Sequence, residues 1–289
     1  MRPLAVVEDL AAALALAIMM LLPLLEIGAR RLFGVGVPAS GPIVQHLVLW
    51  VGLLGAALAA RDGKLLALAT GSLMPAGRLR QVAGLVAATA ATFASTLLAA
   101  GALTFVVSER EAHSSIGAGI PTWVAQLALP AGFVLIALHL VHRAGGRWRA
   151  RALVGSGVVA GLLVARSPGL LAEQPFTPWL VALLVATVCG APIFALLGGA
   201  AVLLFMIDGV TPAAVLVETY ALNTSPTLPA IPLFTLAGFL LAEGGASARL
   251  LRVFRAWVGW CPGGTAVVCA MLCSLDRKST RLNSSHYQQ

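Results

Sequence analysis

The chain has 289 residues, of which 59% are hydrophobic and 10% charged, and its mean hydropathy is +0.94. A soluble domain carries about 25% charged residues, and a disordered chain combines few apolar residues with much charge, so the composition excludes both classes. What remains is an all-α, polytopic helical membrane protein that resides in a lipid bilayer. The net charge of +8 comes without basic–aromatic interleaving, which argues against nucleic acid as a partner.

Four early segments are long and apolar enough to span a membrane, which needs about 20 residues. They are Asp9–Arg30, Gly41–Ala60, Gln81–Ser108 and Trp123–Val141. Glu26 lies near the end of the first segment, where an unpaired carboxylate is costly. We therefore predict that Glu26 forms an ion pair at the helix end with Arg30, one turn further on.

The fifth apolar run, Ala152–Ala165, is shorter than the first four. As a helix it would extend only about 21 Å, so it is either a short span or a helix on the membrane surface. Gly157 and Gly161 have the GxxxG spacing that lets two helices approach closely.

The sixth run, Pro178–Ile207, is too long for one straight span. It would reach about 45 Å as a helix, against a hydrocarbon core of about 30 Å. We predict a helix break at Gly190 and Pro192, so that either one helix is kinked or two short segments meet there. Two further breaks are predicted at the start of the next apolar run, Leu228–Ala242: Pro229 and Pro232.

The distribution of positive charge predicts that the N-terminus is cytoplasmic. With that orientation, three basic residues face outward: Arg30, Arg31 and Arg110. Nine face the cytoplasm: Arg2, Arg61, Lys64, Arg78, Arg80, Arg143, Arg147, Arg149 and Arg151. The expected location is the inner membrane of a bacterium.

The segment Ala246–Trp260 has the pattern of an amphipathic helix rather than a span. Arg249, Arg252 and Arg255 form one face, and Trp257 belongs to the apolar face. Such a helix lies in the membrane interface, although packing on another protein surface is the alternative. Its arginines favour the cytoplasmic side. If residues 152–165 and 178–207 each crossed the membrane once, however, the number of spans before residue 246 would place this helix on the opposite side.

Candidate catalytic and metal-binding groups are sparse, and we predict no enzyme, no metal site and no cofactor. Glu109, Glu111 and His113 share one loop, where a solvated loop is favoured over a metal or proton site. His139 and His142 end the fourth run, where interfacial histidines are favoured over a haem ligand or proton relay. No phosphate-binding loop, GxSxG or HExxH motif is present.

Two groups of motifs resemble a known transporter family. EIGARRLFG from Glu26 and LWVGLLGAALAAR from Leu49 resemble the small, four-helix membrane subunit of tripartite ATP-independent periplasmic (TRAP) transporters. GAPIFALLG from Gly190, LPAIPLFTLAG from Leu228 and PGG from Pro262 resemble the start of the large membrane subunit. The order of the motifs is similar to that of the fused form of these transporters.

The resemblance implies four regions. Residues 1–151 would be the small-subunit-like four-helix region, and 152–178 a connecting helix and linker. Residues 179–275 would be the N-terminal, incomplete part of the large subunit, an elevator-type transport domain with broken helices. The composition changes abruptly after Leu275, so 276–289 is expected to be a non-native tail on a fragment of a longer protein.

The resemblance also implies a function, namely sodium-driven uptake of an organic acid of the dicarboxylate or sugar-acid type. A periplasmic solute-binding protein would be the partner and sodium the coupling ion. The substrate-binding residues are unknown and expected in the missing C-terminal part. Two alternatives are a non-transporting membrane scaffold and a membrane-embedded transferase acting on lipid-linked substrates.

Overall fold

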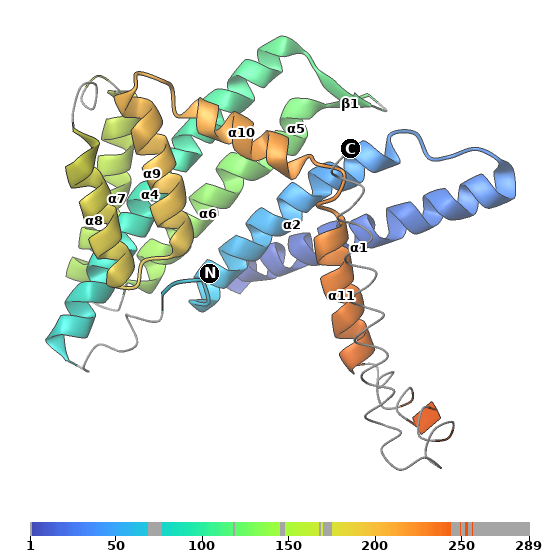
Figure 1. The fold of residues 1–289 in the computed structure, drawn as a ribbon, viewed down its shortest axis with the longest axis horizontal. Helices are drawn as coiled ribbons and strands as arrows, with labels where there is room; N and C mark the ends of the chain where they lie inside the picture. The colour runs from blue at the N-terminus through green and yellow to red at the C-terminus, as the bar shows by residue number, and fades with distance from the viewer. Residues whose placement is uncertain are drawn as a thin grey trace. The chain divides into compact units, whose positions relative to one another are not determined.

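The computed structural model describes residues 2–68, 77–117, 119–144, 148–167, 169, 175–243, 249, 252, 253 and 256. It divides into two compact units, Met1–Pro229 and Ala230–Gln289, and each is described by itself. The described residues are almost all helical (Figure 1). The predicted all-α, polytopic architecture is confirmed.

Each of the four predicted spans is helical in the first unit. The helices are α1 (Arg2–Phe33), α2 (Ser40–Asp62), α4 (Arg78–Ala112), and α5 (Thr122–Gln126) with α6 (Ala128–Arg143). Between α4 and α5 the chain forms a short antiparallel pair, β1 (Ser115–Gly117) and β2 (Ile120–Pro121).

Helix α4 is the centre of the first unit. It packs against α6 and against four later helices of the same unit, residues 148–166, 176–188, 193–207 and 213–223. Small residues at its contacts, among them Ala91, Ala94 and Ala102, let the neighbouring backbones approach. In its most apolar stretch 67% of the residues are buried, against 11% in α1, so α4 is the core helix and α1 lies at the margin.

The fifth apolar run, predicted as either a short span or a surface helix, forms α7 (Trp148–Arg166), which is 19 residues long and therefore about 28 Å. It is long and apolar enough to cross a membrane. Gly157 and Gly161 face α4: a Cβ added at Gly157 would lie 2.6 Å from the Thr89 carbonyl oxygen, and one at Gly161 would lie 2.9 Å from Thr96 Cβ. The GxxxG spacing therefore serves close packing of α7 on α4.

The long sixth run forms two helices packed side by side, α8 (Phe176–Val188) and α9 (Ile193–Ile207) (Figure 1). Helix α8 ends in a Schellman motif, in which the Ala191 amide donates to Ala186 O and the Gly190 amide to Thr187 O, both at 2.9 Å. Gly190 has φ +101°, which suits glycine. If each of these two helices crosses the membrane once, the run crosses twice. The number of spans then agrees with a cytoplasmic position of residues 246–260.

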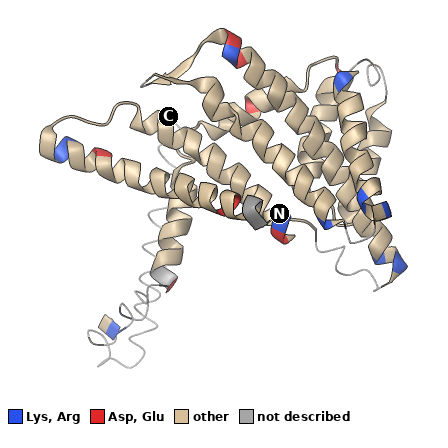
Figure 2. Cartoon of the chain, turned by 180° about the vertical axis from the view of Figure 1, so that it is seen from behind, with Lys and Arg blue, Asp and Glu red and all other residues tan. Residues whose placement is uncertain are grey.

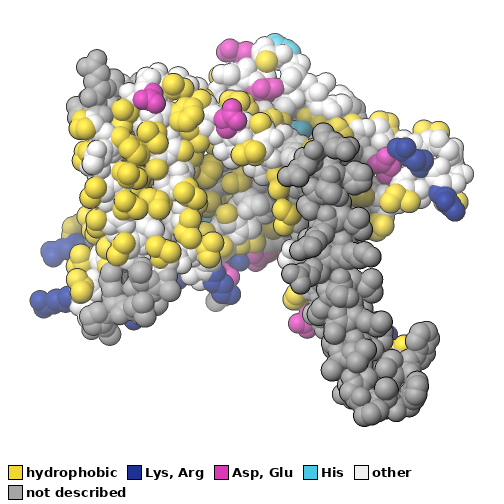
Figure 3. Space-filling view, in the orientation of Figure 1, with side chains coloured by type: hydrophobic (Ala, Val, Ile, Leu, Met, Phe, Trp, Pro, Cys, Tyr) yellow, Lys and Arg dark blue, Asp and Glu magenta, His cyan; other side chains and the backbone are white. Residues whose placement is uncertain are grey.

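A helix that we did not predict, α10 (Ala213–Asn223), follows α9 and packs on α4 and α2. The outer face of the α8–α9 pair carries exposed apolar side chains: Val181, Leu184, Val185, Leu197 and Leu204. Figure 3 shows hydrophobic side chains covering the molecule on this side. A surface of this kind suits contact with lipid tails.

In the second unit, α11 spans Ala230–Glu243. Pro229 directly precedes this helix, but Pro232 lies within its first turn, so the predicted break at Pro232 is wrong. The first amides of a helix have no intrahelical acceptor, and proline is tolerated there. The predicted interfacial helix lies largely outside the described residues, including Arg255 and Trp257. Arg249 and Arg252 are exposed and helical.

Candidate functional site

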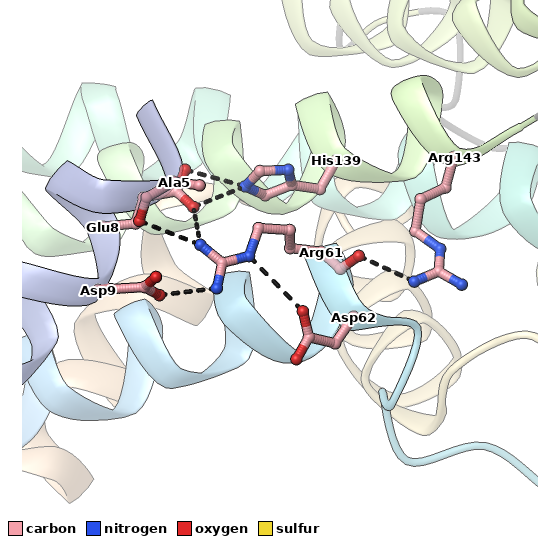
Figure 4. Close-up of polar contacts among 7 residues, drawn as sticks. All are labelled: Ala5, Glu8, Asp9, Arg61, Asp62, His139 and Arg143. Carbon is pink, nitrogen blue, oxygen red and sulfur yellow. Dashed lines mark hydrogen bonds and ion pairs between the residues drawn. The ribbon is translucent and has the colours of Figure 1, made fainter. Parts of the chain in front are cut away.

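Charged side chains gather where α1 begins and α2 ends, in a group that we call the Arg61 cluster (Glu8, Asp9, Arg61, Asp62 and His139; Figure 4). Arg61 donates from Nη2 to Asp9 Oδ1 at 2.7 Å and from Nη1 to the Ala5 carbonyl oxygen at 3.1 Å. Its Nη1 also lies 3.4 Å from Glu8 Oε2, and its Nε lies 3.6 Å from Asp62 Oδ1. Arg61 therefore ties the start of α1 to the end of α2.

Glu8 and His139 are the buried members of the cluster, with 3% and 5% of their side chains exposed. His139 Nε2 lies 2.9 Å from Glu8 Oε1 and 3.1 Å from Glu8 Oε2. Glu8 of α1 reaches His139 and encloses it within the bundle, whereas the place of His139 at the membrane interface stays a prediction. His142 is exposed, as expected of an interfacial residue. The cluster was not predicted, because its partners are far apart in the sequence.

Arg143 and Gly63 complete the end of α2. Arg143 Nη1 donates to the Arg61 carbonyl oxygen at 2.8 Å and so satisfies one of the last carbonyls of the helix (Figure 4). Gly63 has φ +70° and begins a Schellman motif, with its amide bonded to Ala60 O. A Cβ at Gly63 would lie 2.2 Å from Arg143 Nη2, but that atom is the end of a flexible side chain that can move, so the positive φ is what favours glycine here.

The break between α8 and α9 lies against the segment that follows α2. The Ile193 amide donates to the Leu66 carbonyl oxygen at 2.9 Å, and Ala67 forms an isolated antiparallel bridge with Pro192. Pro192 is the N-cap residue of α9, and it has no amide hydrogen to leave unsatisfied. The broken helix pair of the large-subunit-like region is thus bonded to the small-subunit-like region through backbone groups.

A second polar contact joins α2 to α10. His46 Nδ1 lies 2.7 Å from the Pro42 carbonyl oxygen, and His46 Nε2 lies 2.5 Å from the Tyr220 hydroxyl oxygen. Nδ1 must donate to a carbonyl, so Nε2 accepts the proton of Tyr220 in the neutral imidazole. Burial raises the pKa of the Tyr220 hydroxyl, which keeps it a donor. Gln126 is fully buried, and its side-chain amide atoms have no hydrogen-bond partner within the described part of the chain.

The predicted helix-end pair lies at the far end of α1. Arg30 Nη2 donates to Glu26 Oε1 at 2.7 Å, and the Ser40 hydroxyl donates to the other carboxylate oxygen. Ser40 begins α2, so Glu26 connects the two helices as well as pairing within α1.

The prediction that Glu109 and Glu111 lie in a loop is wrong, because both belong to the last turn of α4, whereas His113 caps that helix. Glu111 and His113 are exposed. Ser114 donates to Glu109, and His113 Nδ1 lies 2.7 Å from the Glu111 carbonyl oxygen. Within the described ranges, no three His, Cys, Asp or Glu side chains come close enough to hold a metal ion.

Comparisons with known proteins assign both halves of the chain. Residues 19–150 match the family of tripartite ATP-independent periplasmic transporters, DctQ component, and residues 180–275 match the DctM component. A curated relative is the isethionate TRAP transporter permease protein DctMQ of Oleidesulfovibrio alaskensis. It is 29% identical over 161 residues, which are 53% of this chain and 25% of the relative. The chain therefore spans about a quarter of the length of that relative.

These matches cover most of the chain in the order small component and then large component, and they describe a transporter permease rather than an enzyme. The predicted resemblance is confirmed on both sets of motifs. The chain belongs to the membrane components of tripartite ATP-independent periplasmic transporters, with a DctQ-type part followed by a DctM-type part.

Proposed function

We propose that this chain belongs to a sodium-driven transporter that takes up an organic acid delivered by a periplasmic solute-binding protein. The family assignment supports transport with such a partner. The curated relative is named for isethionate, an organic anion, which supports the class of solute. Sodium coupling rests on the resemblance alone, and the N-terminus is proposed to be cytoplasmic.

We further propose that residues 179–229, which the resemblance places in the moving, elevator-type domain, instead join residues 1–178 in a static wall against which the moving part of the transporter slides. One observation carries this proposal: α4 of the DctQ-type part packs on α8, α9 and α10 of the DctM-type part within one compact unit. Leu98 and Leu203, from the two parts, belong to one buried core cluster. A side chain packed into such a core cannot slide without breaking close contacts.

A disulfide across this contact tests the static wall. A Cβ at Gly199 of α9 would lie 3.3 Å from Ala94 Cβ of α4, close to the 3.5–4.5 Å that a disulfide needs. The Ala94→Cys/Gly199→Cys pair is made in a background without the native cysteines. Because the relative is about four times longer than the aligned stretch, the protein translated from the complete genomic reading frame is used.

The protein is reconstituted in liposomes with its binding protein, a sodium gradient and isethionate, dicarboxylates or sugar acids. We expect sodium-dependent uptake of one of these acids, and the same uptake in the oxidised and reduced double variant. Uptake that stops on oxidation and returns on reduction would contradict the static wall alone. If none of the acids is taken up, or if uptake does not depend on the sodium gradient, the proposed transport function is contradicted.

A further inference from the structure

A cavity of about 1110 Å³ opens at one end of the first unit. Its rim comprises the residues just after α2, the first turn of α4, the end of α6, the start of α7 and the turn between α8 and α9. Three arginines line it: Arg80, Arg143 and Arg149. Among the residues that the structure describes, no acidic side chain lines it. Figure 2 shows basic residues, in blue, gathered along the ribbon where α4 begins.

Two of these arginines, Arg80 and Arg149, form no ion pair within the described part of the chain, so their charges are available to a ligand. Arg143 already donates to the Arg61 carbonyl oxygen. Arg149 lies 5.7 Å over the Trp148 ring. Guanidinium groups bind phosphate oxygens through paired, charge-assisted hydrogen bonds, so the rim is suited to a phosphate group.

Apart from Gln81, the other side chains of the wall are apolar. Leu85, Ala88, Leu140 and Leu153 line the cavity, and they come from α4, α6 and α7, which are long and apolar enough to cross a membrane. A soluble phosphate would satisfy the arginines but leave this wall exposed to water. A ligand with a charged head and a hydrocarbon tail matches both parts, because removing apolar surface from water also stabilises binding.

We propose that this cavity binds an anionic phospholipid, with the phosphate among Arg80, Arg143 and Arg149 and an acyl chain along Leu85 and Leu153. Basic pockets between membrane helices on the cytoplasmic side bind acidic headgroups in this way. The turn between α8 and α9 also lines the cavity, at Cys189, Gly190 and Pro192. The lipid therefore touches both the DctQ-type and the DctM-type part and holds them together. The inference does not depend on transport.

The test measures lipid binding to the purified chain by native mass spectrometry. The full chain is delipidated in neutral detergent and titrated with dioleoyl phosphatidylglycerol. Dioleoyl phosphatidylcholine has the same acyl chains without net negative charge, and glycerol phosphate has the phosphate without acyl chains. We expect one saturable phosphatidylglycerol, bound at least tenfold more tightly than phosphatidylcholine and not displaced by millimolar glycerol phosphate or isethionate.

Two variants locate the site. Arg80→Gln/Arg149→Gln should weaken phosphatidylglycerol binding at least tenfold. The matched control, Arg110→Gln/Arg166→Gln, removes the same charge from the opposite ends of the same two helices, α4 and α7, and should leave binding unchanged. Gly84→Leu keeps every arginine and fills the cavity: a Cβ there meets nothing within 4 Å, and the residue lines the cavity. It should also weaken binding at least tenfold, with unchanged helical circular dichroism.

Each opposite result would overturn the proposal. Equal binding of phosphatidylcholine would remove the role of the arginines. Displacement of the lipid by glycerol phosphate or isethionate would make the cavity a site for a soluble anion. An equal loss in the control pair would show a general attraction of charge to the protein, and full binding by Gly84→Leu would place the lipid elsewhere.

Discussion

His139 Nε2 lies 2.9 Å from Glu8 Oε1, although 131 positions separate the two residues in the chain. Glu8 is on α1 and His139 on α6, and the two side chains are buried together. Helix α1 otherwise packs on α2 and is largely exposed. The polar contact is therefore the specific tie between the marginal helix α1 and the core of the bundle.

Replacing Glu8 with Ala should destabilise the protein strongly. The change leaves the buried His139 without its partner and takes one carboxylate from Arg61, and leaving a buried polar group without its hydrogen-bond partner costs about 1–3 kcal/mol. Thermal unfolding in detergent, followed by tryptophan fluorescence, measures the effect. Asp9→Asn is the control: Asp9 binds the same arginine but is 55% exposed, so its loss should cost less than about 1 kcal/mol. Equal losses would contradict the role of burial.

Replacing Gly157 with Ala should loosen α7 from α4. The new Cβ would lie 2.6 Å from the Thr89 carbonyl oxygen, a contact that backbone atoms must move to relieve, and overpacking of this kind costs about 1–3 kcal/mol. Gly155→Ala is the matched control in the same helix, because its Cβ meets nothing within 4 Å. Unfolding in detergent should shift for the first variant and not for the second. A shift of equal size in both would mean that helix propensity, and not contact, controls this site.

The spans could be predicted from the sequence because each is a local property of length and hydropathy. The predicted break at Gly190 and Pro192 lies between α8 and α9. It too could be predicted locally, because proline has no amide hydrogen with which to continue the backbone hydrogen bonds of α8. Pro232 shows the limit of that reasoning, since the same residue type is harmless in the first turn of α11. Helix α10 was missed because only 11 residues form it, and its stability comes from packing on α4.

The Arg61 cluster could not be predicted from the sequence, because which distant charges meet depends on how the helices pack. The sequence placed Glu26 and Arg30 together through their helical spacing, but it gave no sign that Ser40 would join them. The burial of His139 could not be predicted for the same reason: its position at the end of α6 is local, whereas its burial depends on Glu8 of α1.

Replacing Gly101 with Ala should disturb the packing of α10 on α4. A Cβ at Gly101 would lie 2.9 Å from the Pro212 carbonyl oxygen and 3.0 Å from Leu216 Cδ2, and Leu216 is fully buried. We expect faster amide hydrogen exchange in residues 213–223, by about an order of magnitude for each 1.4 kcal/mol of lost packing. Gly84→Ala, in the same helix but with open space at its Cβ, should leave that exchange unchanged. Unchanged exchange in the Gly101 variant would show that α10 is held elsewhere.

The last prediction is the orientation of the chain in the membrane. Basic residues at the ends of the early spans are divided nine to three, and the side with more of them is cytoplasmic in membrane proteins of this kind. In a background without the native cysteines, Ser115→Cys in the exposed β1 strand should react with an impermeant maleimide added to intact spheroplasts. Lys64→Cys, exposed just after α2, should react only once the membrane is permeabilised. Because α4 lies between the two sites and is long and apolar enough to cross once, the two sites are expected on opposite faces, and the reverse pattern would place the N-terminus outside. That outcome would put the Arg61 cluster and the arginine-lined cavity on the periplasmic face.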